Sequence, residues 1–117
     1  MPVEMGREEF DRLVDTALSQ IPERFLTLLE NCVVIVEDEP DPSDPELFGY
    51  YDGTPLSDRT SQYGGVLPDR IVIFRGPLLR YCRDADEVVS EVRITVWHEV
   101  AHFFGIDDEH LDDLGYA

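Results

Sequence analysis

All three histidines of the chain lie within 13 residues, from position 98 to position 110, in a pattern that suits a metal ion. The sequence reads His98-Glu99-Val100-Ala101-His102. Residues four apart on an α-helix lie on the same face, one turn apart, so His98 and His102 can offer ring nitrogens to one cation. Histidine is the commonest metal ligand in proteins. The pattern therefore indicates a metal site with two histidine ligands on one helix.

Glu99 is placed to act on a water molecule beside the metal rather than to bind the metal itself. It follows His98 directly, so it lies about 100° round the helix from it. A catalytic zinc site needs a third protein ligand and an open position for water. The alternative interpretation is that the two histidines are surface or core residues of a helix that carries a glutamate by chance.

The third ligand is expected just beyond the helix. Gly105 can adopt the left-handed conformation that ends a helix and turns the chain, which would let a following residue return to the metal. The candidates are Asp108, Glu109 and His110. The spacing favours Asp108, three residues after the glycine, whereas residue type alone favours His110. The residues themselves leave both alternatives open.

A long helix must position this motif. Asp84 is a candidate N-cap, and Asp86 and Glu87 would lie in the first turn, where negative charge is favoured. Neither glycine nor proline occurs from Val88 to Phe104. Apolar residues at helical spacing predict a stripe that faces the core: Val89, Val92 (or Arg93), Val96, Val100 and Phe103. Another face would carry Glu91, Thr95, His98 and His102, while Trp97 and Phe104 are expected in the core.

The preceding elements predict an α+β domain. Helices are expected over Arg7–Gln20 and from Pro22 to about Glu30, and a short helical or turn segment from Gly76-Pro77. Strands are expected over Val33–Val36 (buried), Leu47–Tyr51 and Ile71–Phe74, with a proline-rich loop at 38–45 and a long loop at 54–65. This order indicates a small mixed sheet with helices packed on one face, in a single domain spanning 1–117. The segment Arg70–Arg75 is predicted either to form an edge strand that binds an extended peptide or to be an ordinary internal strand.

The composition excludes several classes of function. The formal net charge is −17, which argues against nucleic-acid binding and favours cations and basic peptides. The sequence contains no lysine, so a lysine Schiff-base mechanism is excluded. The first ten residues have no apolar signal-peptide region, and no apolar run is long enough to span a membrane, so a cytoplasmic location is expected. Cys32 and Cys82 are expected to be free thiols.

The stretch from His98 to Asp108 resembles the zincin metallopeptidases, specifically the Asp-zincins, whose pattern is H-E-x-x-H-x-x-G-x-x-D. The chain as a whole looks like a bacterial mini-zincin. The resemblance implies Zn²⁺ held by His98, His102 and Asp108, with Glu99 as the general base and a peptide or protein as the substrate. Both methionines precede the motif, so the methionine turn of the metzincins is missing.

Two other functions fit the same residues. The chain could be an interaction or metal-binding module that keeps a zincin scaffold without peptidase activity. It could also be a hydrolase that acts on an amide other than a peptide bond, which the sequence does not distinguish from a peptidase.

Overall fold

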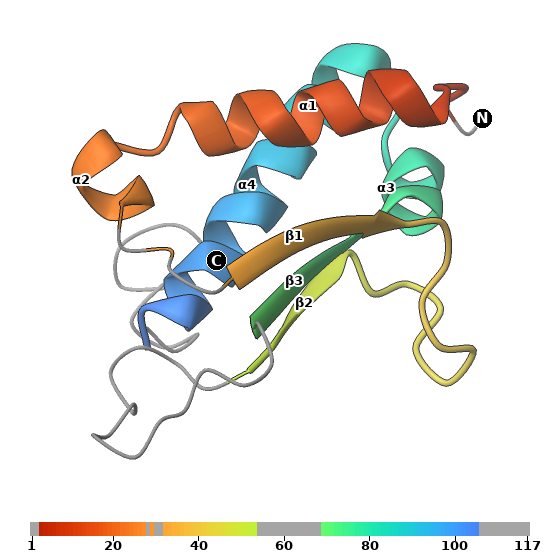
Figure 1. Ribbon diagram of the computed structural model, residues 1–117. Helices are drawn as coiled ribbons and strands as arrows, with labels where there is room; N and C mark the ends of the chain where they lie inside the picture. Colours follow the sequence, from red (N-terminus) through yellow and green to blue (C-terminus); the bar gives the residue numbers. More distant parts are fainter. Residues whose placement is uncertain (1–2, 28, 30–31, 54–68, 106–117) are drawn as a thin grey trace.

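The computed structural model describes residues 3–27, 29, 32–53 and 69–105. Two helices come first and are followed by three strands and two further helices (Figure 1). The helices are α1 (Arg7–Ser19), α2 (Glu23–Leu26), α3 (Arg75–Tyr81) and α4 (Ala85–Phe103). The strands are β1 (Cys32–Glu37), β2 (Gly49–Asp52) and β3 (Asp69–Phe74).

The strands form a mixed sheet in the order β1-β3-β2. Strand β3 pairs in parallel with β1 and antiparallel with β2, so it is the central strand. Its residues Ile71, Val72 and Ile73 are accordingly buried. The prediction that Arg70–Arg75 lies at a sheet edge is wrong, and the alternative of an internal strand is confirmed. Among the described residues, the edges of the sheet are β1 and β2.

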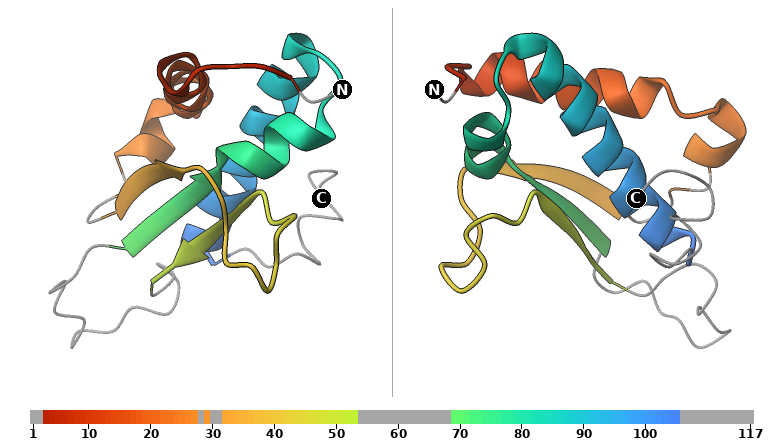
Figure 2. Two further views of the ribbon diagram at one scale, coloured as in Figure 1. Left: turned by 90° about the vertical axis from the view of Figure 1, so that its right-hand side faces the viewer. Right: turned by 180° about the vertical axis from the view of Figure 1, so that it is seen from behind.

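Helices α1 and α4 lie on one side of the sheet, and α3 follows directly from the end of β3 (Figures 1 and 2). The core between these layers is built from apolar side chains that are almost completely buried: Phe10, Val14, Ile71, Ile73, Val92, Val96 and Phe103. Each side chain of this kind contributes about 1.5–3 kcal/mol when it is fully buried. The predicted α+β class, with helices on a small mixed sheet, is confirmed.

Helix α4 begins and ends where the sequence predicts. The Asp84 side chain accepts a hydrogen bond of 2.8 Å from the Glu87 amide, which satisfies one of the unpaired donors of the first turn. The helix ends at Phe103, and Gly105 follows with a φ of 87°, in the left-handed region. The Gly105 amide donates to the His102 carbonyl at 2.9 Å. Capping and the glycine turn therefore fix where the two histidines lie on the helix.

Other predicted details differ from the structure. The buried face of α4 runs through Val88, Val92 and Thr95, so Val88 is buried and Val89 is 46% exposed. Val33 is 41% exposed, because β1 is an edge strand and not a fully buried one. Helix α2 is shorter than predicted, and β2 begins two residues later than predicted. Trp97 is half-buried, and its ring nitrogen donates to the Ala17 carbonyl at 2.9 Å, which ties α4 to α1.

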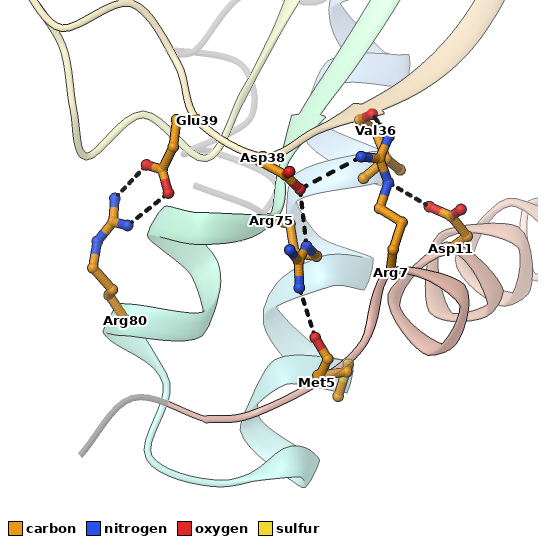
Figure 3. A network of polar contacts seen from close by, with 8 residues as sticks. All are labelled: Met5, Arg7, Asp11, Val36, Asp38, Glu39, Arg75 and Arg80. Carbon is orange, nitrogen blue, oxygen red and sulfur yellow. Dashed lines mark hydrogen bonds and ion pairs between the residues drawn. The ribbon is translucent and has the colours of Figure 1, made fainter.

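Arginine side chains connect the end of β1 with α1 and α3 (Figure 3). The Asp38 carboxylate accepts from Arg75 at 3.1 Å and from Arg7 at 3.4 Å. Glu39 binds both terminal nitrogens of Arg80, each at 2.9 Å. These five residues are called the arginine network below. The bond from Arg80 lowers the pKa of Glu39 below its ordinary value.

Gly76 lies where α3 approaches the end of β1, beside the arginine network. Its amide donates to the Asp38 carbonyl at 2.8 Å. A Cβ at this position would lie 2.7 Å from that carbonyl oxygen and would overlap the Glu39 carboxylate. The close approach of α3 to the end of β1 therefore requires glycine here.

None of the helices in the described part of the chain is long and apolar enough to cross a membrane. Cys82 is a buried free thiol, as predicted, and Cys32 is half-buried.

Candidate metal centre

The last turns of α4 bring His98, Glu99 and His102 into one group. One possible ligand atom from each residue lies within 4.8 Å of the corresponding atoms of the other two. The two imidazole ring centroids are 4.5 Å apart. Both histidines are half-buried, and Glu99 is only 6% exposed. The predicted pairing of the histidines on one face, with the glutamate beside them, is confirmed for these residues.

A contact between Glu99 and His102 favours one tautomer of the imidazole. Glu99 Oε1 lies 3.2 Å from His102 Nδ1. In the tautomer that this contact favours, Nδ1 carries the proton and donates it to the carboxylate. The lone pair of the neutral ring then lies on Nε2, as in metal-binding histidines whose other nitrogen donates to a carboxylate.

The donor set of this group fits zinc. Zinc binds imidazole nitrogen at about 2.0–2.1 Å in tetrahedral geometry, so two of its ligand atoms lie roughly 3.3 Å apart. The three possible ligand atoms of this group lie within 4.8 Å of one another. The predicted third ligand, Asp108, and its alternatives Glu109 and His110 lie outside the described residues. Their role therefore stays a prediction.

A cavity of about 350 Å³ adjoins this group. His98 and Glu99 line it together with Glu91, Ile94 and Thr95, the residues that precede them on α4. Opposite α4 it is lined by the segment that leads into β2: Asp44, Glu46, Leu47, Phe48 and Gly49. This space is called the metal-side cavity below. The predicted grouping of Glu91, Thr95 and His98 on one face of α4 agrees with this lining.

Sequence reasoning did not place these residues beside α4. It assigned Asp44 to a proline-rich loop at 38–45 and residues 47–51 to a short strand. The signal that could have pointed to them is Gly49. A Cβ at Gly49 would lie 2.8 Å from the Val72 carbonyl oxygen and 3.0 Å from the Thr95 side chain. Only glycine allows β2 to approach α4 this closely, about one turn before His98.

A second contact missed by sequence reasoning supports the end of α4. The Tyr51 hydroxyl donates to the buried Asp69 carboxylate at 2.5 Å, which joins β2 to β3. The Tyr51 ring packs edge-on against Phe103, with centroids 6.1 Å apart. Because Phe103 follows His102 directly, this packing holds the last turn of the helix against the sheet.

A model of the zincin-like metallopeptidases matches residues 29–116. This chain belongs to that family. A solved structure of a conserved hypothetical protein from Thermo thermophilus is similar, with a TM-score of 0.58 and 26% sequence identity. The similarity covers 94% of this chain and 97% of that chain. The search of curated proteins finds no match. The zincin-like family membership predicted from the stretch His98 to Asp108 is therefore confirmed.

Proposed function

We propose that this protein is a zinc-dependent metallopeptidase that hydrolyses peptide bonds with Glu99 as the general base. The observation that carries the proposal is the convergence of His98, Glu99 and His102 beside a cavity large enough to admit part of a substrate. Membership of the zincin-like metallopeptidases supports a metal-dependent hydrolase or a metal-binding module.

His98 and His102 would hold the zinc ion, with Asp108 as the proposed third ligand and His110 as the alternative. Bound zinc acts as a Lewis acid, which lowers the pKa of a coordinated water toward about 7 and polarises a substrate carbonyl. The contact between Glu99 and His102 would help to orient the imidazole ring when the ion is bound.

Glu99 would transfer the proton in this reaction. Its carboxylate takes a proton from the attacking water and delivers it to the amine nitrogen that leaves. Glu99 follows His98 on the same helix, so its position relative to the two histidines is set by the backbone of α4. Its burial keeps bulk water from competing for the carboxylate.

The Glu99→Gln variant tests this function. Zinc-loaded wild-type protein is incubated with a mixture of internally quenched peptides, and products are identified by mass spectrometry. We expect cleavage that a chelator abolishes, and a rate in Glu99→Gln that is at least about 100-fold lower at unchanged zinc content. Glu9→Gln, an exposed change on α1, is the matched control and should cleave like the wild type.

Two results would contradict the proposal. Cleavage by Glu99→Gln at the wild-type rate would remove Glu99 from the mechanism. Zinc-loaded wild type that cleaves none of the peptides would favour the metal-binding interaction module.

A further inference from the structure

We propose that the metal-side cavity binds a cationic side chain, arginine or lysine, of the peptide next to the bond that is cleaved. The inference specifies the substrate of the proposed hydrolysis and therefore rests on that function. The cavity is continuous with the candidate metal centre, because His98 and Glu99 belong to its lining. A side chain bound there would lie within one or two residues of the reacting carbonyl.

The charge of the cavity selects for a cation. Asp44 and Glu46 reach it from the segment before β2, and Glu91 reaches it from α4. Among the described residues that line the cavity, none other than His98 can carry a positive charge. No described residue forms a salt bridge with any of these three carboxylates. Their charges therefore remain to attract a ligand.

Arg80, which interacts with one of these carboxylates, forms its hydrogen bonds with other groups. Glu46 contributes to the raised pKa of Arg80, so the two charges interact. The Arg80 guanidinium nevertheless forms its hydrogen bonds with Glu39 and with the Pro45 carbonyl. Glu46 therefore interacts with Arg80 at a distance, without a salt bridge between the two.

The apolar part of the lining fits the stem of the same side chains. Leu47, Phe48 and Ile94 line the cavity together with the carboxylates. Arginine and lysine bury their methylene groups on apolar surface while their charged ends meet polar groups. The volume of about 350 Å³ is at the low end of ligand sites, which suits one long side chain with its adjoining backbone.

Hydrogen bonds to the backbone hold in place the segment that carries Asp44 and Glu46. The Phe74 amide donates to the Phe48 carbonyl at 2.8 Å, and the Leu47 amide donates to the Asp44 carbonyl at 3.3 Å. Arg80 donates to the Pro45 carbonyl at 3.2 Å. These bonds fix where Asp44 and Glu46 stand before a ligand arrives, which lowers the entropy cost of binding.

The test measures binding, so that it does not depend on turnover. The full chain, labelled with ¹⁵N and supplied with zinc, is titrated with N-acetyl-arginine-N-methylamide, and amide shifts are followed by NMR. The norleucine and glutamate analogues are the matched probes. We expect the arginine probe to shift amides of 46–49 and 91–98. It should bind on the order of tenfold more tightly than norleucine, since the two exposed carboxylates and the half-buried Glu91 each contribute a small attraction.

The variant Asp44→Asn/Glu46→Gln/Glu91→Gln should reduce binding of the arginine probe to the level of norleucine. The control Glu4→Gln/Glu9→Gln/Asp15→Asn makes the same change in net charge at exposed positions outside the cavity, and should keep the preference. Thermal unfolding of both variants establishes that each is folded.

Equal binding of the arginine and norleucine probes, undiminished binding in the cavity variant, or no binding of any probe would overturn the proposal. Cleavage of peptides without a preference for arginine would leave the hydrolase function intact and remove the subsite. Binding of the arginine probe to a protein that cleaves no peptide would keep the subsite and remove the hydrolase function.

Discussion

Two groups of carboxylates lie at the two ends of the segment that joins β1 to β2, and only the first group forms salt bridges with arginines in the described part of the chain. Asp38 and Glu39 follow β1, and both bind arginine side chains of the arginine network. Asp44 and Glu46 precede β2, and no described residue forms a salt bridge with either of them. The two groups do not differ in being exposed. The side chains of Asp38 and Glu39 are 58% and 54% exposed, and Asp44 and Glu46 are exposed as well.

The difference lies in what surrounds each group. The first group joins three elements of the fold, whereas the second lines the metal-side cavity together with His98 and Glu99. In a chain with a net charge of −17, carboxylates that line one cavity without salt bridges to described residues weaken the folded state by repulsion. Their placement beside the candidate metal centre suggests a role in binding rather than in stability.

The substitution Gly76→Ala breaks the arginine network most severely. The new Cβ would crowd the Asp38 carbonyl and the Glu39 carboxylate, so α3 and the end of β1 would have to move apart. We expect a loss of about 1–3 kcal/mol in the free energy of unfolding, measured with urea, and an unchanged zinc content. The control is Gly6→Ala, where a Cβ would meet nothing within 4 Å, and its effect should stay within about 0.5 kcal/mol. A wild-type urea midpoint for Gly76→Ala would show that this contact is not needed.

Removing one carboxylate from each group compares them directly. Asp38→Asn loses ion pairs with Arg7 and Arg75, which should cost about 1 kcal/mol because the pairs are exposed. Glu91→Gln should cost nothing or stabilise slightly, because it relieves repulsion in the metal-side cavity. Urea unfolding at low salt measures both, and the effect of Asp38→Asn should shrink in about 1 M salt. A larger loss in the free energy of unfolding for Glu91→Gln than for Asp38→Asn would show that the cavity carboxylate, and not the network carboxylate, stabilises the fold.

The stability supplied by Glu39 should depend on pH in a definite direction. Its pKa is lowered in the folded protein by the hydrogen bond from Arg80, so the ionised form is the one that is stabilised. The contribution is therefore present above the ordinary pKa of 4.5 and is lost as the pH falls through the lower value of the folded state. Wild type and Glu39→Gln should differ in unfolding temperature at neutral pH and converge in acid. In an Arg80→Met background this convergence should disappear, and its persistence would assign it to another group.

The sequence contains enough information to predict helix α4 and its cap. Asp84, Glu87 and Gly105 act through the backbone of their own neighbours, so local chemistry decides where the helix begins and ends. The pairing of His98 with His102 follows from the helical period alone. For the same reason the candidate metal ligands on α4 can be predicted without knowledge of the fold.

Long-range contacts were not predictable in the same way. The central position of β3 depends on the pairing of strands separated by loops, which residues 70–75 do not reveal. The metal-side cavity depends on Gly49 lying against Thr95, two residues far apart in the chain. The contact of Tyr51 with Asp69 also forms only when β2 and β3 pair. The predicted loop at 54–65 lies outside the described residues.

We propose that His98 and His102 hold a zinc ion beside Glu99, with Asp108 as the third ligand. Elemental analysis of the untagged protein tests it most directly, applied to the wild type and to His98→Ala, Asp108→Ala and His110→Ala. We expect one zinc ion per chain in the wild type and in His110→Ala, and loss of zinc in the other two. Loss of zinc in His110→Ala but not in Asp108→Ala would make His110 the third ligand in place of Asp108. A wild-type protein that binds no zinc even after zinc is added would contradict the account.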